Sequence, residues 1–201
     1  MMIKHYSYDQ IEIAAYQEAK SGKAFCGDAH LVIKTEEYLV CAVIDGLGSG
    51  EWANHSAEAA MSIIKDTHDK SVEEIVQACN LKMVNKRGVV LTIVKVDFER
   101  QELWYCNVGN IGFVLYQPDK TMVQPFPVRG YLSGRMQKVS STCYRFQPGS
   151  AFVMYSDGVV VRPSNKMMLT MNSPSSQIDK FVEVYGREAK DDITLVIGQF
   201  R

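Results

Sequence analysis

The sequence predicts an α+β domain in which helices cover a pair of antiparallel sheets. Short, strongly apolar segments recur along the chain with short polar connections between them, which is typical of an antiparallel meander. Two amphipathic segments follow the first three of these apolar segments, and a third amphipathic segment precedes the last one. This order of strands and helices favours layers of helix and sheet around one core.

The strands are predicted from runs of β-branched, aromatic and other apolar residues bounded by turn residues. In the first strand, Ile11, Ile13 and Ala15 alternate with polar residues, which indicates one buried face. Aromatic residues along the later strands are expected to fill the core, namely Tyr105, Tyr116, Phe126, Phe146 and Phe152. The predicted strands are 11–15, 30–35, 38–45, 88–97, 102–109, 112–117, 138–147, 150–157 and 193–200.

Two helices are predicted after the glycine-rich segment that follows Asp45. Residues 53–68 place small and apolar side chains at spacings of three and four, which indicates an amphipathic helix. The second helix is predicted at 71–85, because Ser71 stands three residues before Glu74 in a capping-box pattern. Its core-facing residues are expected to be Ile75, Cys79, Leu81 and Met83.

A third helix is predicted before the last strand. Ser173 is its expected N-cap, Pro174 suits the first helical position, and Gly186 is its expected end. The stretch 167–176 carries no clear pattern, and we expect a surface loop there.

Composition excludes several classes of protein. The chain has 201 residues and a net charge of −1, which gives no electrostatic basis for binding nucleic acid or an acidic membrane. Its five cysteines are scattered and never form a C-x-x-C pair, which favours reduced thiols in the cytoplasm over disulfides or structural zinc. No segment approaches the run of about 18 apolar residues that crosses a bilayer. We expect one soluble, cytoplasmic, monomeric domain spanning 1–201.

Acidic residues stand at the ends of four strongly apolar strands. Asp45 and Asp157 each follow a strand and precede a glycine, whereas Asp28 and Asp191 stand just before strands. Taken singly, an Asp-Gly pair is a common turn signal. If the strand ends share one edge, however, the carboxylates would raise one another's pKa, and no Lys or Arg in these motifs relieves the repulsion.

A divalent cation would relieve that repulsion. Ligation by oxygen alone suits Mg²⁺ or Mn²⁺, and the four unpaired histidines argue against zinc. Gly46 would let its own carbonyl approach a metal ion, which would explain why the chain loosens directly after Asp45.

The segments "CGDAH", "CAVIDGLGSG", "VMYSDG" and "DDITLVIG", in this order, resemble the PPM-type metal-dependent serine/threonine protein phosphatases, in their compact bacterial branch. The resemblance runs from about Gly22 to Phe200. It implies an α-β-β-α sandwich of two antiparallel sheets flanked by helices. "NKRG", "NVGNIGFVL", "GYLSG" and "KDDITLVIGQ" look still more like the feedback phosphatase of the stressosome in the sigma-B general stress pathway. Phosphorylated STAS-domain proteins of the stressosome are the substrates that this implies.

The resemblance also implies a site and a mechanism. Asp45 would bridge two divalent ions, Mn²⁺ or Mg²⁺, and the Gly46 carbonyl would bind one of them. Asp28, Asp157 and Asp191 would complete the metal site, some of them through water, and Asp192 is not counted as a ligand. Asp45 and Asp157 would then be catalytic by way of a metal-activated water that attacks phosphorus, without a protein nucleophile.

Three positions depart from the eukaryotic members of that family. Leu47 replaces the histidine that is thought to protonate the leaving group, Asn110 replaces an aspartate used for a further ion, and Gly27 replaces a glutamate. General acid catalysis, commonly worth about 10² to 10⁴ in rate, must therefore come from elsewhere or be weaker. We expect a thinner metal shell and no third ion.

Other candidates are weaker. The "DGLGSG" segment lacks a following Lys-Ser/Thr and so is not a nucleotide-binding loop. Cys26 is expected to be a structural thiol, and His30 and His55 to be packed or surface side chains. Arg87, Arg129 and Arg135 lie in predicted loops, where they are either ordinary surface residues or contacts for an acidic partner. The alternative functions are a catalytically inactive binding module and a small-molecule phosphoesterase.

Overall fold

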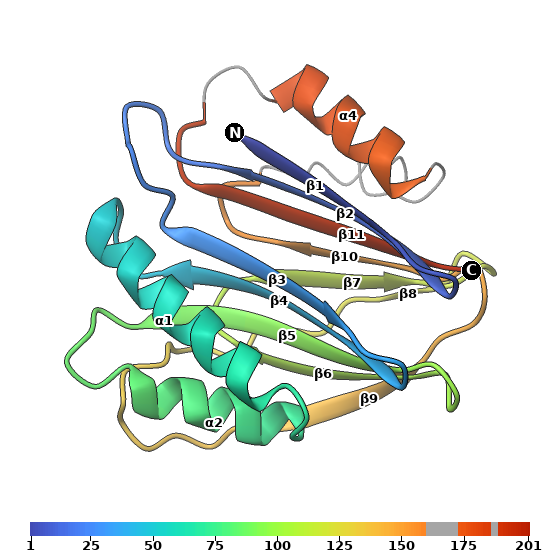
Figure 1. Cartoon of the computed structure of the whole chain (residues 1–201), viewed down its shortest axis with the longest axis horizontal. Helices are drawn as coiled ribbons and strands as arrows, with labels where there is room; N and C mark the ends of the chain where they lie inside the picture. Colours follow the sequence, from blue (N-terminus) through green and yellow to red (C-terminus); the bar gives the residue numbers. More distant parts are fainter. Residues whose placement is uncertain (160–172, 186–188) are drawn as a thin grey trace.

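Two antiparallel sheets pack face to face in the computed structural model, which describes residues 1–159, 173–185 and 189–201 (Figure 1). The first sheet contains, in spatial order, β1 (Met2–Ser7), β2 (Ile11–Glu18), β11 (Ile193–Phe200), β10 (Ala151–Tyr155), β7 (Gly112–Tyr116) and β8 (Met122–Val123). The second contains β3 (Asp28–Lys34), β4 (Tyr38–Gly46), β5 (Val89–Asp97), β6 (Glu102–Val108) and β9 (Ser141–Arg145). The predicted α+β class with two antiparallel sheets is confirmed.

Helices cover the outer faces of both sheets (Figure 1). The helices α1 (Glu51–Thr67) and α2 (Val72–Lys82) pack on the second sheet, and α4 (Pro174–Tyr185) packs on β2 and β11 of the first. All predicted strands and helices are present, whereas β1 and the short β8 were not predicted. Residues 167–172 of the predicted surface loop, and Gly186 at the predicted end of the third helix, lie outside the described residues. The end of that predicted loop is wrong, because α4 already begins at Pro174.

The strand β4 is apolar almost throughout because both of its faces are buried. Leu39, Cys41 and Val43 point into the core between the sheets, and alternate residues such as Val40 and Ile44 pack under α1 and α2. The two apolar layers on either side of the second sheet therefore hold β4 in one register. That register decides where Asp45 and Gly46, at the end of the strand, are placed.

The prediction of one buried face for β2 is wrong, because both faces are covered. Ile11 and Ile13 point into the core between the sheets, as predicted. Ala14 and Tyr16 are also fully buried, on the opposite face, where α4 packs. The Tyr16 ring meets the Phe181 ring edge to face, with centroids 5.6 Å apart. A half-polar pattern in the first strand could not reveal that a distant helix would cover its other face.

Two residues predicted for the core are exposed. Leu81 is 69% exposed in α2, because at about 100° per residue it lies nearly opposite Cys79 and Met83, which are buried. Phe126 is 95% exposed and lies outside any strand. Prolines at 125 and 127 flank it, and a residue without an N–H cannot continue a sheet ladder.

The helix starts follow the predicted caps. In α2 the Ser71 hydroxyl accepts from the Glu74 N–H, and the Glu74 carboxylate accepts from the Ser71 N–H at 3.0 Å, which completes the capping box. In α4 the Ser176 N–H donates to the Ser173 hydroxyl at 3.4 Å. Both predicted N-caps are therefore confirmed.

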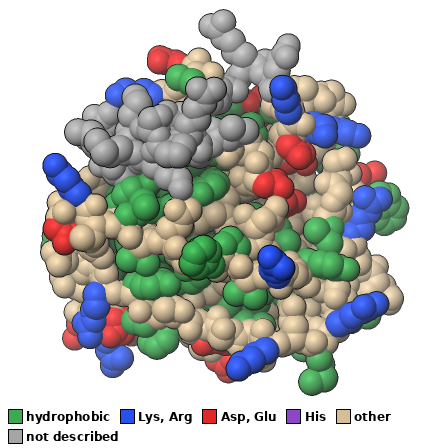
Figure 2. All heavy atoms as spheres, turned by 180° about the vertical axis from the view of Figure 1, so that it is seen from behind, with side chains coloured by type: hydrophobic (Ala, Val, Ile, Leu, Met, Phe, Trp, Pro, Cys, Tyr) green, Lys and Arg blue, Asp and Glu red, His purple; other side chains and the backbone are tan. Residues whose placement is uncertain are grey.

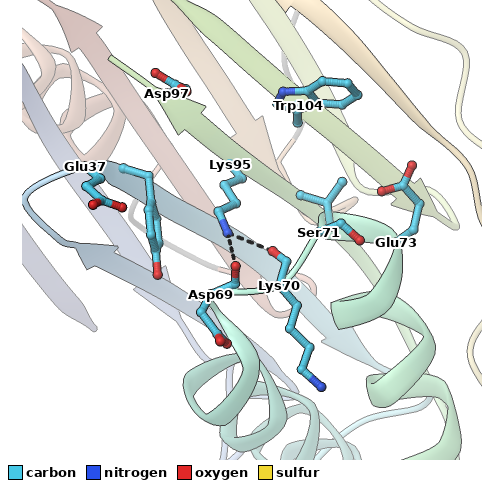
Figure 3. A pocket seen from close by; sticks show the side chains of 10 residues that line it. Glu37, Asp69, Lys70, Ser71, Glu73, Lys95, Asp97 and Trp104 are labelled. Atoms are coloured by element: carbon cyan, nitrogen blue, oxygen red, sulfur yellow. Dashed lines mark hydrogen bonds between the residues drawn. The ribbon is translucent and has the colours of Figure 1, made fainter. Parts of the chain in front are cut away.

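Lys95 of β5 ties the turn between α1 and α2 to the sheet (Figure 3). Its Nζ donates to the backbone carbonyls of His68, Asp69 and Lys70 at 3.0, 2.8 and 2.7 Å, and it lies 4.2 Å from the centre of the Tyr38 ring. These carbonyls follow the C-terminal end of α1, where the helix dipole favours a cation.

Lys95→Met is expected to lower the free energy of unfolding by about 2 kcal/mol, because it removes charge-assisted hydrogen bonds to three carbonyls. Urea denaturation measures this loss. The matched control is Lys65→Met, which removes a lysine on the exposed face of α1 and should cost less than about 0.5 kcal/mol. Equal losses in the two variants would contradict the role assigned to Lys95.

Candidate active site

Asp28 and Asp45 lie directly opposite each other on neighbouring strands. The antiparallel register of β3 and β4 pairs Asp28 with Asp45 at the end where β3 begins and β4 finishes. The Gly46 N–H donates to the Gly27 carbonyl at 3.0 Å, which extends the pairing one residue further. Asp28 is 1% exposed and Asp45 is partly buried. Two carboxyl groups are thus held side by side in a poorly solvated place.

The first sheet contributes acidic residues at the same edge of the molecule. Asp157 follows β10, and Asp191 and Asp192 precede β11, with which β10 pairs antiparallel. Hydrogen bonds of Ser156 and Thr194 join the two ends, at 2.9 Å from the Ser156 N–H to the Thr194 carbonyl and 2.8 Å from the Thr194 N–H to the Ser156 hydroxyl.

One cavity of about 210 Å³ receives the acidic side chains of both sheets. The four predicted metal-ligating aspartates therefore lie around one space, as the argument from shared strand ends requires. No Lys, Arg or His is among the described residues that line it, so the cavity is acidic throughout. The lining residues are Asp28, Asp45, Leu47, Gly48, Val90, Asn110, Asp157, Asp191 and Asp192.

The surroundings of the cavity disfavour the ionised form of its carboxyl groups. Burial raises the pKa of Asp28 to about 7, although hydrogen bonding to Ser156 and Thr194 lowers it, and the neighbouring carboxylates Asp192 and Asp157 add to the rise. Burial also raises the pKa of Asp45 to about 8, with Asp28, Asp157, Asp191 and Asp192 as further causes. The Oδ2 atom of Asp28 is buried without a hydrogen-bond partner among the described residues.

These features fit a hard divalent cation. The donor set consists of oxygen. Among the residues that the structure describes, one buried carboxylate oxygen has no partner and the lining supplies no positive charge. In the described part of the chain, no three His, Cys, Asp or Glu side chains already stand close enough together to hold a metal ion.

Gly46 has a packing role that the sequence did not suggest. It is buried and does not line the cavity, and a Cβ placed on it would overlap the backbone carbonyl of Ala53 in α1. Glycine is therefore needed where α1 begins against the end of β4. The predicted metal contact of the Gly46 carbonyl stays a prediction.

Asp192 lines the cavity, although it was not among the predicted ligands. It is 5% exposed, and its Oδ1 accepts the Lys20 N–H at 2.9 Å. A Cβ on Gly27 would lie 2.7 Å from the Asp192 Oδ2, so the side chain of a larger residue at 27 would displace this carboxylate. The absence of a side chain at Gly27 and the presence of Asp192 are thus linked. The two consecutive aspartates at 191 and 192 were the feature of the sequence that could have indicated that Asp192 also belongs to the site.

Two of the departures from the eukaryotic pattern also lie in the cavity. Asn110 donates from Nδ2 to the Asp157 Oδ2 at 2.9 Å, so its amide fixes a carboxylate. Leu47 lines the cavity with an apolar side chain, and its N–H donates to the Gly88 carbonyl at 3.0 Å. Neither can donate a proton to a leaving group, and apart from aspartates no titratable residue is found among the described lining residues.

The weaker candidates lie outside this cavity. Burial raises the pKa of the Cys26 thiol to about 12, so it is not a reactive thiolate. Burial lowers the pKa of His30 to about 4, and its Nδ1 lies 2.8 Å from Gln17 Oε1. His55 is exposed on α1 beside Glu51. Arg87, by contrast, packs against Gly48 at the rim of the cavity.

A hollow of about 340 Å³ lies at the opposite end of β4 and β5, beside the turn of α1 and α2 (Figure 3). Tyr38, Lys95 and Trp104 are among its lining residues, and all three donors of Lys95 already serve backbone carbonyls. It contains none of the predicted site residues.

Known proteins resemble the chain over nearly its whole length. The family model described as Stage II sporulation protein E (SpoIIE) matches residues 35–201. Phosphoserine phosphatase RsbX of Bacillus subtilis (strain 168) is 36% identical over 198 residues, which are 98% of this chain and 99% of RsbX. A crystal structure of RsbX in complex with magnesium matches with a TM-score of 0.94 and 36% identity, covering 100% of both chains.

Two further solved structures share the fold. One is described as the bacterial stressosome, a modular system adapted to control secondary messenger signalling, with a TM-score of 0.85, 25% identity and coverage of 95% of this chain and 100% of that one. The other is the catalytic domain of the serine threonine protein phosphatase PstP with two manganese ions, with a TM-score of 0.73, 15% identity and coverage of 95% and 98%. None of the helices in the described ranges is long and apolar enough to cross a membrane.

Proposed function

We propose that this chain, which belongs to the SpoIIE family and is a PP2C-type protein serine/threonine phosphatase, hydrolyses its phosphoester at the cavity of five aspartates. The resemblance to this phosphatase family and to RsbX is confirmed. The observation that supports the site is the meeting of Asp28 and Asp45 from one sheet with Asp157 and Asp191 from the other. The cavity between them has no Lys, Arg or His among its described lining residues.

We propose two divalent ions, Mn²⁺ or Mg²⁺, as the cofactors of this site. Asp28, Asp45, Asp157 and Asp191 would hold them, together with the Gly46 carbonyl. PP2C phosphatases use divalent metals, and the relatives described above contain magnesium or manganese. When bound, the ions supply an activated water and neutralise charge on the phosphoryl oxygens.

The residues of the chain prepare the site for that chemistry. Asp28 and Asp45 release their protons when a cation enters, because their pKa values are raised in its absence. Asn110 orients Asp157 through the hydrogen bond between their side chains. Since Leu47 cannot act as an acid and metal-bound aspartates carry no proton, the leaving oxygen would take its proton from water.

As substrates we propose phosphorylated STAS-domain proteins of the stressosome, dephosphorylated as negative feedback on the sigma-B general stress response. The similarity to RsbX and to the structure described as the stressosome supports this choice. We further propose that residues 1–201 form a single phosphatase domain that acts as a monomer in the cytoplasm. The alternatives are a binding module that has lost activity and a phosphatase of small phosphoesters.

Phosphate release tests the proposal. A phosphothreonine-bearing STAS-domain protein and p-nitrophenyl phosphate are each incubated with the wild type and Asp28→Asn, in Mn²⁺, Mg²⁺ or EDTA. We expect metal-dependent release from the protein that EDTA and the substitution abolish. Release from the small ester alone would favour a small-molecule phosphoesterase. An absence of release from both substrates would favour the binding module.

A further inference from the structure

The loop between β8 and β9 exposes large apolar side chains. Phe126 is 95% exposed, Met136 is 102% exposed, and Val128 and Tyr131 are each nearly half exposed. Val84, beside α2, is 54% exposed and lies against Gly134 of this loop. Scattered surface apolar residues are ordinary, but a group on one loop indicates an interaction site.

Hydrogen bonds hold this loop at three places. The Val128 N–H donates to the Asn107 Oδ1 at 2.8 Å, and the Val128 carbonyl accepts from the Gly109 N–H at 2.7 Å. Leu132 pairs with Val89 through two backbone hydrogen bonds of 2.8 and 3.1 Å.

The third place is Asn80 of α2. Its Oδ1 accepts from the N–H groups of Ser133 and Gly134, and its Nδ2 donates to the Arg135 carbonyl at 2.8 Å. Because the backbone is fixed while the apolar side chains point outward, a partner that binds them would not have to order the loop.

The same anchors connect the loop to the aspartate cavity. Gly109, which binds Val128, directly precedes Asn110 of the cavity. Leu132 pairs with Val89, which directly precedes the cavity residue Val90. The Gly88 carbonyl accepts from Leu47. The loop therefore lies beside the mouth of the site.

The surface formed by residues 84–88 and 124–138 is basic as well as apolar. These two segments contain no Asp or Glu, and all of their cations are exposed: Lys86, Arg87, Arg129, Arg135 and Lys138. Within the described ranges, the salt bridges of the chain involve none of these five side chains. On the face drawn in Figure 2, hydrophobic side chains gather in clusters, with Lys and Arg side chains around them and some Asp and Glu side chains between.

We propose that residues 84–88 and 124–138 form the docking surface for the phosphoprotein substrate, an inference that rests on the proposed function. The partner is a folded phosphoprotein with acidic and apolar residues next to its phosphoserine or phosphothreonine. Carboxylates beside the phosphate would be repelled by the aspartates of the cavity, whereas the five cations of this surface, of which Arg87 lies at the rim of the cavity, attract them. The apolar side chains then bury against the partner and slow its dissociation.

Steady-state kinetics with two substrates test this proposal. The variants are Arg129→Glu with Arg135→Glu, and Phe126→Ser with Met136→Ser. The matched control is Val184→Ser, which changes a 68% exposed apolar residue on α4. We expect each double variant to lower kcat/KM for the phosphothreonine STAS-domain protein about tenfold or more, and the control to leave it unchanged. For p-nitrophenyl phosphate, which is too small to reach the loop, all variants should stay within about twofold of the wild type.

Two synthetic phosphoserine peptides test whether the residues next to the phosphate direct recognition even without a folded partner. The wild type should prefer a peptide with Glu and Leu flanks over one with Lys and Gly flanks, and the arginine variant should lose that preference. Unchanged kinetics in active variants, or equal losses on both substrates, would overturn the docking proposal. A wild type inactive on every substrate would instead overturn the proposed function, and the docking proposal with it. A dimer that the Phe126 variant dissociates in sedimentation analysis would assign the surface to self-association and overturn the proposal.

Discussion

Asp45→Asn is expected to reduce metal-dependent phosphate release by about 10³-fold or more, while the metal-free protein becomes more stable. Asp45 lies opposite Asp28 and beside three further aspartates of the cavity, and burial together with these neighbours raises its pKa to about 8. A neutral amide of the same shape removes one charge from this group. It also removes one of the carboxylates proposed to hold the two ions.

Thermal unfolding after EDTA treatment, at pH 8, measures the stability half of this prediction. A gain of about 1 kcal/mol would raise the midpoint by roughly 2 to 4 °C in a chain of this size. Asp66→Asn is the matched control, because Asp66 is exposed on α1 and should change neither activity nor midpoint. An Asp45 variant that loses activity and also unfolds at a lower temperature would show that the carboxylate stabilises the fold, contrary to the account.

The stability of the metal-free protein is expected to fall as the pH rises from 6.5 to 8, and Mn²⁺ is expected to reverse this trend. The pKa of Asp28 is raised to about 7 and that of Asp45 to about 8, from about 3.8 in the unfolded chain. The folded state therefore binds more protons than the unfolded state. The stabilisation that these two protonated carboxyl groups contribute is fully present below about pH 4 and is lost as the pH rises through 7 to 8.

The pH window from 6.5 to 8 isolates the aspartates. His30, whose pKa is lowered to about 4 in the fold, changes stability mainly below pH 6.5, because the unfolded histidine gains its proton there. Thermal unfolding midpoints in EDTA and in Mn²⁺, across this window, give the measurement. The double variant Asp28→Asn with Asp45→Asn should show a flat profile in EDTA and little response to Mn²⁺. A wild type whose profile is equally flat would refute the assignment of raised pKa values to these carboxyls.

Much of the fold could be predicted because its strands are apolar on both faces. The uninterrupted apolar run of β4, bounded by polar residues, predicts a buried strand. The capping box marks the start of α2 within four residues of sequence. The strand β1 was missed because only Ile3 and Tyr6 of it are even partly buried, so it shows no clear alternation. Phe126 was predicted in the core because it is aromatic, but the prolines on both sides of it exclude a strand, and its side chain is exposed.

The candidate site was predictable where the sequence repeats a local signal and unpredictable where two distant segments meet. Four aspartates at strand ends can be read from the chain alone, and all four line one cavity. The roles of Asp192 and Asn110 depend on contacts with Lys20 and Asp157, which lie far from them in sequence. The metal contact of the Gly46 carbonyl stays a prediction, whereas the close packing of Gly46 against Ala53 of α1 could not be read from the sequence, because it arises only when the helix packs on the sheet.

Calorimetric titration of Mn²⁺ into EDTA-treated, desalted protein tests most directly whether the aspartate cavity is a divalent metal site. We expect saturable binding to the wild type with release of protons, seen as a heat that depends on the ionisation enthalpy of the buffer. Asp28→Asn with Asp45→Asn should lose this binding, whereas Asp66→Asn should keep it. Binding of equal affinity in the wild type and the double variant, or no binding to the folded wild type, would contradict the account.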